Sequence, residues 1–161
     1  MNNVLDTIKP GLLMTLLGLL FGIGMGILFG INEDMFKDFV AQGVAANPTV
    51  HDASSADKIW RYAQRAHFHG TGIAAFSLGL LFLVTLSSLS PQLKRISSIL
   101  IGLGSFYPLA WLTMYFVAPA IGRDPAHAYW LTEVFTYIGV GGLSAGLFIV
   151  CTNLFFGLFK A

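Results

Sequence analysis

The sequence predicts an all-α integral membrane protein, a bundle of four membrane-spanning helices. Of its 161 residues, 55% are hydrophobic and only 11% are charged, whereas soluble domains carry about 25% charged residues. A helix needs roughly 20 consecutive apolar residues to cross a hydrocarbon core about 30 Å thick. The chain contains four apolar runs of this length. We therefore expect a single transmembrane domain over residues 1–161, with spans at about 11–31, 64–89, 96–121 and 127–158.

The first span carries a glycine zipper, a row of glycines at unbroken four-residue spacing. Its members are Gly18, Gly22, Gly26 and Gly30. Such a row allows the backbone of another helix to approach closely. The last span has a shorter row, made of Gly139, Gly142 and Gly146. We expect the two rows to pack on each other inside one bundle, and a seam between two copies of the chain is the alternative.

Between the first two spans we expect a polar loop over residues 32–57 that starts as an amphipathic helical stretch. Met35, Phe36, Phe39 and Val40 recur there at helical spacing among charged residues. In the third span, Pro108 removes a backbone donor, so we expect a bend near the centre of that helix.

Ionisable side chains gather where the spans meet one membrane face. His67 and His69 open the second span, His127 and Glu133 open the fourth, and His51 lies in the first loop. Keeping ionisable groups at the edge of a bilayer is costly, which makes them a functional-site hypothesis by default.

Helical geometry suggests how this site is arranged. Residues two apart point about 200° away from each other, so His67 and His69 do not easily share one metal ion. We expect His67 to point into the bundle, because it shares a face with small residues, and His69 to face the headgroups, a neighbouring subunit or a second site. His67, Glu133 and Tyr115 are then expected in one pocket. Further pocket candidates are Met114, Trp111 and Arg65.

Several functions fit this set of residues. The imidazoles of His67, His69 and His127 and the Glu133 carboxylate are ligands for copper, iron or zinc, with Met114 as a soft addition. Histidines from two helices also clamp haem, and His67 with His127 is the best pair. A proton relay through Glu133 is a third interpretation. The plain structural alternative is a His67–Glu133 hydrogen bond, with tryptophans and tyrosines as interface anchors.

The segment Ala66-His67-Phe68-His69-Gly70, followed by Tyr107-Pro108-Leu109-Ala110-Trp111, resembles a family of small, uncharacterised bacterial four-span proteins. The shared pattern is Ala-His-x-His at the head of the second span and Tyr-Pro-x-x-Trp in the third, and the resemblance covers roughly residues 66–146. Some of these proteins are similar to a fragment of the haem-copper oxidase catalytic subunit. That similarity implies haem or copper ligands at His67 and His69, although the further histidines of the oxidase site are absent.

Arg65-Ala66-His67 also resembles the start of the second span in the trimeric membrane-associated glutathione and eicosanoid enzymes. This resemblance implies a glutathione-dependent enzyme. The chain departs from that family at His69, Gly70 and Ile73, and it lacks the basic motif of the last span.

The remaining expectations concern partners and location. A net charge of +1 without a basic tract gives no argument for nucleic acid. The principal interpretation is a protein that binds a metal ion or haem near one membrane face, for redox chemistry or metal handling. The alternative is a non-catalytic homo-oligomer or a subunit of a membrane complex. We expect the bacterial inner membrane, with cytoplasmic termini because Lys94-Arg95 forms a compact basic turn.

Overall fold

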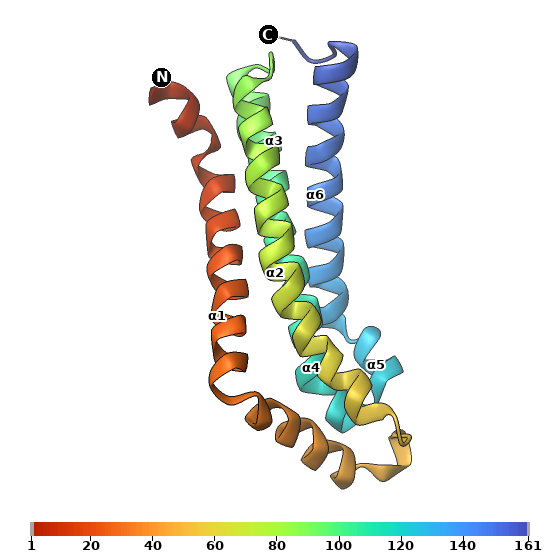
Figure 1. Ribbon diagram of the computed structural model, residues 1–161. Helices are drawn as coiled ribbons and strands as arrows, with labels where there is room; N and C mark the ends of the chain where they lie inside the picture. Colours follow the sequence, from red (N-terminus) through yellow and green to blue (C-terminus); the bar gives the residue numbers. More distant parts are fainter. Residues whose placement is uncertain (1, 161) are drawn as a thin grey trace.

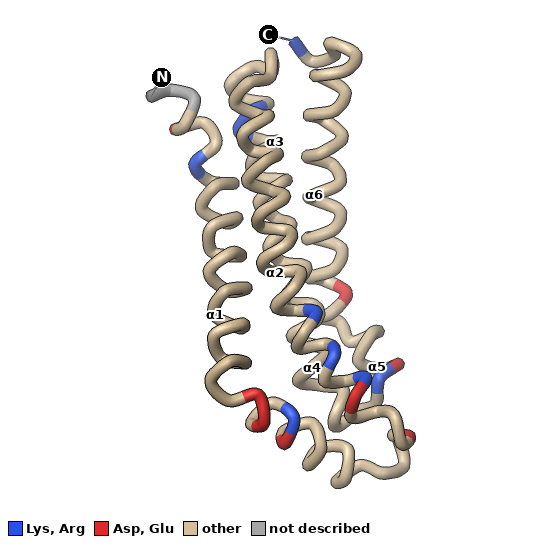
Figure 2. The backbone as a smooth tube through the Cα atoms, in the orientation of Figure 1, with Lys and Arg blue, Asp and Glu red and all other residues tan. Residues whose placement is uncertain are grey.

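The computed structural model describes residues 2–160, and it confirms an all-α chain with four helices long and apolar enough to cross a membrane. Both ends of the described chain lie at the same end of the bundle (Figure 1). Lys, Arg, Asp and Glu lie towards the two ends of the bundle, and the stretch between them carries almost none (Figure 2). Of the single domain expected over residues 1–161, Met1 and Ala161 fall outside the described residues.

Helix α1 (Asn2–Ala46) consists of a membrane span and a second segment that runs across the end of the bundle opposite the two termini (Figure 1). We call this end, which holds the α1–α2 and α4–α6 connections, the loop end. The direction changes at Asn32, whose backbone leaves helical geometry at φ −156° and ψ 74°. The Asn32 side chain accepts a hydrogen bond from the backbone N–H of Met35 at 3.1 Å, so it caps the second segment. The segment between the first two spans therefore starts as a helix, as expected, and this helix continues to Ala46.

The remaining elements follow in a simple order. They are η1 (Pro48–Val50), α2 (Ser55–Leu86), α3 (Pro91–Leu103), η2 (Gly104–Phe106), α4 (Tyr107–Ile121), α5 (Arg123–His127) and α6 (Trp130–Phe156). The third span consists of α3 and α4, and η2 interrupts it directly before Pro108. This interruption is the irregularity that Pro108 predicts, because proline cannot donate the helical hydrogen bond.

The third span is the centre of the bundle. Helix α1 packs on α2 and α3, while α6 packs on α3 and α4. The first and last spans thus lie on opposite sides of the bundle (Figure 1). The expectation that their glycine rows pack on each other is wrong, because the third span separates them.

The first row instead packs on α2 and the third span, and the α6 row packs on the third span. A Cβ atom on Gly22 would lie 2.5 Å from the backbone N of Thr71 in α2, and one on Gly18 would lie 2.6 Å from Ser105 Oγ. A Cβ on Gly26 would lie 2.6 Å from the His67 ring, whereas nothing lies within 4 Å of Gly30. In α6, the row closes on the third span, where Gly139 meets Tyr107, Gly142 meets Leu103 and Gly146 meets Ile101.

Candidate functional site

His67 lies in the seam between α1 and α2. Its Nδ1 is 2.7 Å from the carbonyl oxygen of Gly22, and a carbonyl only accepts, so Nδ1 carries the proton and donates. The ring fills the space above Gly26 and meets Phe29 edge-on, with a centroid distance of 5.9 Å. His67 is therefore a hydrogen-bonded contact between two helices.

His69 lies on the other side of α2, against α4. Its Nδ1 donates to the carbonyl oxygen of Arg65 at 2.8 Å. The imidazole stacks on Trp111 at a centroid distance of 5.6 Å and meets Tyr107 edge-on at 5.2 Å. Of the three positions expected for His69, the headgroups, a neighbouring subunit or a second site, its contacts with Trp111 and Tyr107 agree with a second site apart from His67. Helix α2 has neighbours on both sides, so both histidines occupy helix–helix seams.

Trp111 is the hub of an aromatic cluster. The Arg65 guanidinium lies over the indole, 4.6 Å from its centroid, a favourable cation–π position. Tyr62 and His127 contact the same ring at centroid distances of 5.7 and 6.4 Å. The Tyr62 hydroxyl is also 3.0 Å from His127 Nε2, so this phenol fixes the orientation of the imidazole.

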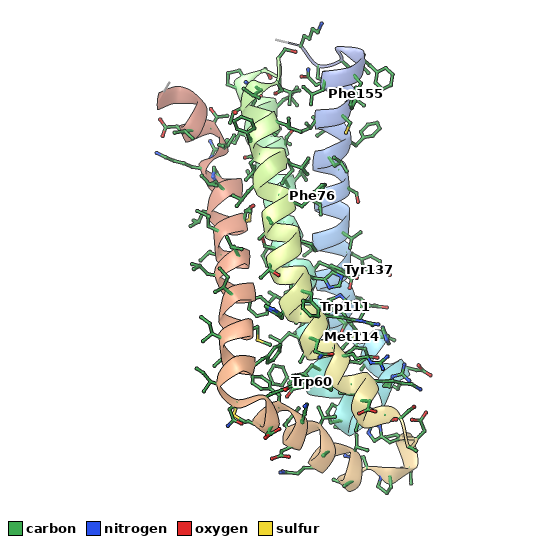
Figure 3. All side chains as sticks on the ribbon, viewed as in Figure 1. Trp60, Phe76, Trp111, Met114, Tyr137 and Phe155 are labelled. Carbon is green, nitrogen blue, oxygen red and sulfur yellow. The ribbon has the colours of Figure 1, made fainter. Side chains whose placement is uncertain are left out.

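A cavity of about 290 Å³ opens beside this cluster, between α4 and α6. It is lined by Tyr107, Trp111, Met114, His127, Thr132, Glu133, Thr136 and Tyr137. Trp111, Met114 and Tyr137 lie at neighbouring levels in the half of the bundle next to the loops (Figure 3). The cavity joins a thioether, an imidazole and a carboxylate from three separate elements.

Three residues expected in this pocket do not line the cavity, and one of them, Arg65, lies over the Trp111 ring instead. His67 contacts α1 and is not among the cavity residues, so it does not meet Glu133. Tyr115 is buried and donates its hydroxyl proton to the carbonyl oxygen of Phe36 at 3.0 Å. The pairing of His67 with His127 around a haem is not supported either, because the two rings lie on different sides of α2.

The donors of this cavity define what it can bind. Within residues 2–160, His, Cys, Asp and Glu side chains form no group of three or more that could hold a metal ion. A closed structural site with four such ligands is therefore not what this part of the chain offers. His127 and Glu133 are the two residues of this lining whose side chains could bind a metal ion, and the Met114 sulfur could add a weak third donor of the kind found in copper sites.

The sequence contained one signal for this site that residue type alone did not reveal. Tyr62, Arg65 and His69 stand at positions i, i+3 and i+7 of α2, which share one face of a helix. All three contact Trp111. Recognising this shared face of α2 would have placed His69 beside the third span and added Tyr62 to the site.

No family model, curated protein or solved structure matches this chain. The two resemblances drawn from the sequence therefore stay predictions, and the functional argument depends on the geometry of the cavity.

Proposed function

We propose that this integral membrane protein binds a transition metal ion in the cavity between α4 and α6, for redox chemistry or metal handling near the loop-bearing membrane face. The observation that carries the proposal is the meeting of Met114, His127 and Glu133 at one cavity. They come from three different elements, so only the folded bundle assembles the set. Copper fits best, because it accepts imidazole together with a soft thioether.

The surroundings of His127 support this role. A metal-binding imidazole usually makes a hydrogen bond through its other ring nitrogen, which fixes the ring and its tautomer. The Tyr62 hydroxyl lies at that distance from Nε2 and leaves Nδ1 for a metal ion. With few protein ligands, such an ion keeps open positions for water or a substrate. The exposed Glu133 and His127 side chains make the cavity accessible from the side.

Elemental analysis of purified protein tests the proposal. We expect about one copper ion per chain after loading, and its loss in His127→Ala and in Glu133→Gln. His67→Gln is the matched control, since it removes an imidazole at the same membrane end but outside the cavity. The proposal fails if the two cavity variants, shown by circular dichroism to be folded, bind as much copper as the control.

The proposed location is the bacterial inner membrane with cytoplasmic termini, which places the cavity on the extracytoplasmic side. The support is the basic pair Lys94-Arg95 near the start of α3, at the end of the bundle that holds both termini. Labelling a cysteine introduced at Ala45 with an impermeant reagent in intact cells tests this orientation, and protection from the reagent would reverse it.

A non-catalytic oligomer or accessory subunit is a second candidate, favoured by glycines that face away from the bundle. A Cβ on Gly72, Gly79 or Gly141 would meet nothing within 4 Å. Small residues on lipid-facing surfaces of spans are typical of helix association in membranes. Cross-linking in native membranes tests this candidate, and a monomer at all protein concentrations would exclude a homo-oligomer.

A further inference from the structure

A second polar cavity lies at the loop end, where the first loop is fastened to the end of the third span. The carbonyl oxygen of Pro119 accepts hydrogen bonds from His51 Nε2 at 3.0 Å and from Asn47 Nδ2 at 3.2 Å. Directly afterwards, Gly122 turns the chain with a φ of 86°, a conformation suited to glycine. A Cβ there would lie 3.3 Å from the Val50 carbonyl oxygen. These contacts hold the loop against the α4–α5 junction.

The open cavity there measures about 310 Å³ and includes His51, Asp52, Arg123 and Asp124 in its lining. Two polar atoms of this lining, Arg123 Nε and His51 Nδ1, are buried and have no hydrogen-bond partner in the described protein. Arg123 also forms no ion pair within residues 2–160. A guanidinium cannot lose its proton, and buried polar groups are nearly always hydrogen-bonded. The two atoms therefore need partners from outside the described protein, either water or a ligand.

The two unpartnered atoms need opposite kinds of partner. Arg123 only donates, so it requires an acceptor, and an oxyanion suits it best. Because His51 Nε2–H donates to the Pro119 carbonyl, the neutral ring presents a lone pair at Nδ1 and requires a donor. A simple anion would leave His51 without a donor, and a simple cation would leave Arg123 without an acceptor.

The carboxylates exclude a simple anion for a second reason. Asp52 and Asp124 both line the cavity. Asp52 Oδ1 accepts hydrogen bonds from the Ser54 backbone, the Ser54 hydroxyl and the Ser55 hydroxyl, which hold the pKa of this carboxyl down at about 2. It is therefore ionised at neutral pH. Asp52 Oδ2 also pairs with Lys58 Nζ at 3.7 Å. Arg123 and Asp124 are therefore the opposite charges left to match a ligand that carries both a negative and a positive group.

We propose that this cavity binds a zwitterion in which a phosphate is joined to a primary ammonium group, the chemistry of the phosphatidylethanolamine headgroup. The phosphate accepts from Arg123, and the ammonium donates to His51 Nδ1 and to the Asp124 carboxylate. Arg123 follows the apolar helix α4 by two residues, which places it at the depth of the lipid headgroups. The proposal is independent of the metal-binding function, because the two cavities share no lining residue.

Lipid titration of the full chain in detergent, followed by native mass spectrometry, tests the proposal. We expect short-chain phosphatidylethanolamine to bind at least about 10-fold more tightly than short-chain phosphatidylcholine, whose quaternary ammonium has no N–H to donate. Phosphatidylglycerol, an anion without an ammonium group, should also bind weakly. Equal binding of all three lipids, or tightest binding of phosphatidylglycerol, would overturn the proposal.

Variants separate the two halves of the site. Arg123→Gln should weaken phosphatidylethanolamine binding about 10-fold to 100-fold, the usual range for a charge-assisted hydrogen bond. The matched control is Arg61→Gln, an exposed arginine on α2 outside this cavity, which should bind as the wild type does. Asp124→Asn keeps the guanidinium and should weaken phosphatidylethanolamine but not phosphatidylglycerol. Unchanged lipid binding in both Arg123→Gln and Asp124→Asn would refute the assignment.

Free O-phosphoethanolamine distinguishes a lipid from a soluble source of the same chemistry. Competition only at concentrations far above those of the lipid supports a bilayer ligand. Competition at equal concentrations supports the same zwitterion site and assigns it to a soluble ligand.

Discussion

The close crossing of α1 and α2 predicts a large difference between two neighbouring glycines. A Cβ on Gly22 would lie 2.5 Å from Thr71 N and 2.7 Å from the carbonyl carbon of Gly70, both of them backbone atoms that cannot rotate away. A Cβ on Gly24 would meet nothing within 4 Å. Gly22→Ala must therefore push the helices apart, whereas Gly24→Ala changes no packing.

The size of the effect follows from the separation required. Ordinary contact distances of about 3.5–4 Å require the helices to move by roughly 1 Å, and a gap of that size forfeits about a quarter to a half of each dispersion contact. The 2.7 Å hydrogen bond from His67 to Gly22 lengthens as well, and such bonds between membrane helices contribute about 0.6 kcal/mol on average. Together with the usual range for overpacking, we expect Gly22→Ala to lower the free energy of unfolding by about 1–3 kcal/mol.

Reversible unfolding of both variants in mixed micelles, with the free energy of unfolding as the readout, measures this difference. Gly24→Ala should lie within about 1 kcal/mol of the wild type, the scale of helix propensity differences. Equal stability of Gly22→Ala and Gly24→Ala would refute the close backbone contact between α1 and α2.

Three further predictions concern the site, the loop and the outer surface. Tyr62→Phe should weaken copper binding about 10-fold by releasing the imidazole that its hydroxyl orients, and a titration with unchanged affinity would contradict that role. The pKa of Asp52 is about 2 in the folded protein and 3.8 without its hydrogen bonds, so its stabilisation of the loop is complete above about pH 4 and is lost as the pH falls towards 2. Hydrogen exchange of the Ser54 amide should accelerate over that pH interval, after correction for intrinsic rates. Constant protection of this amide would exclude Asp52 ionisation as the source of the loop's stability. If the outer glycines of α6 form a subunit seam, Gly141→Leu should lower the oligomer mass in detergent while leaving the fold intact, whereas Gly142→Leu should reduce stability because a Cβ there lies 2.7 Å from the Leu103 side chain.

Sequence patterns predicted those features of the fold that depend on short segments. The four spans follow from apolar length, and the break ahead of Pro108 follows from its missing N–H. The helical stretch after Asn32 follows from the spacing of its apolar residues, although nothing in that spacing showed that it would continue to Ala46.

Sequence patterns did not predict which helices lie next to each other. Periodicity correctly separated His67 from His69 by about 200° around α2, but it did not say which helix each face would meet. The third span lies at the centre of the bundle, so His67 meets α1 and His69 meets α4. The same arrangement kept Glu133 away from His67 and gave it His127 and Met114 as cavity neighbours. Which spans are adjacent depends on the whole set of packed surfaces, and this decided the composition of the site.

X-ray absorption spectroscopy of the copper-loaded protein tests metal coordination in the α4–α6 cavity most directly. We expect a mixed shell of nitrogen or oxygen with one sulfur, and loss of only the sulfur in Met114→Leu. A spectrum without sulfur in the wild type, or one that Met114→Leu leaves unchanged, would contradict coordination by Met114, His127 and Glu133.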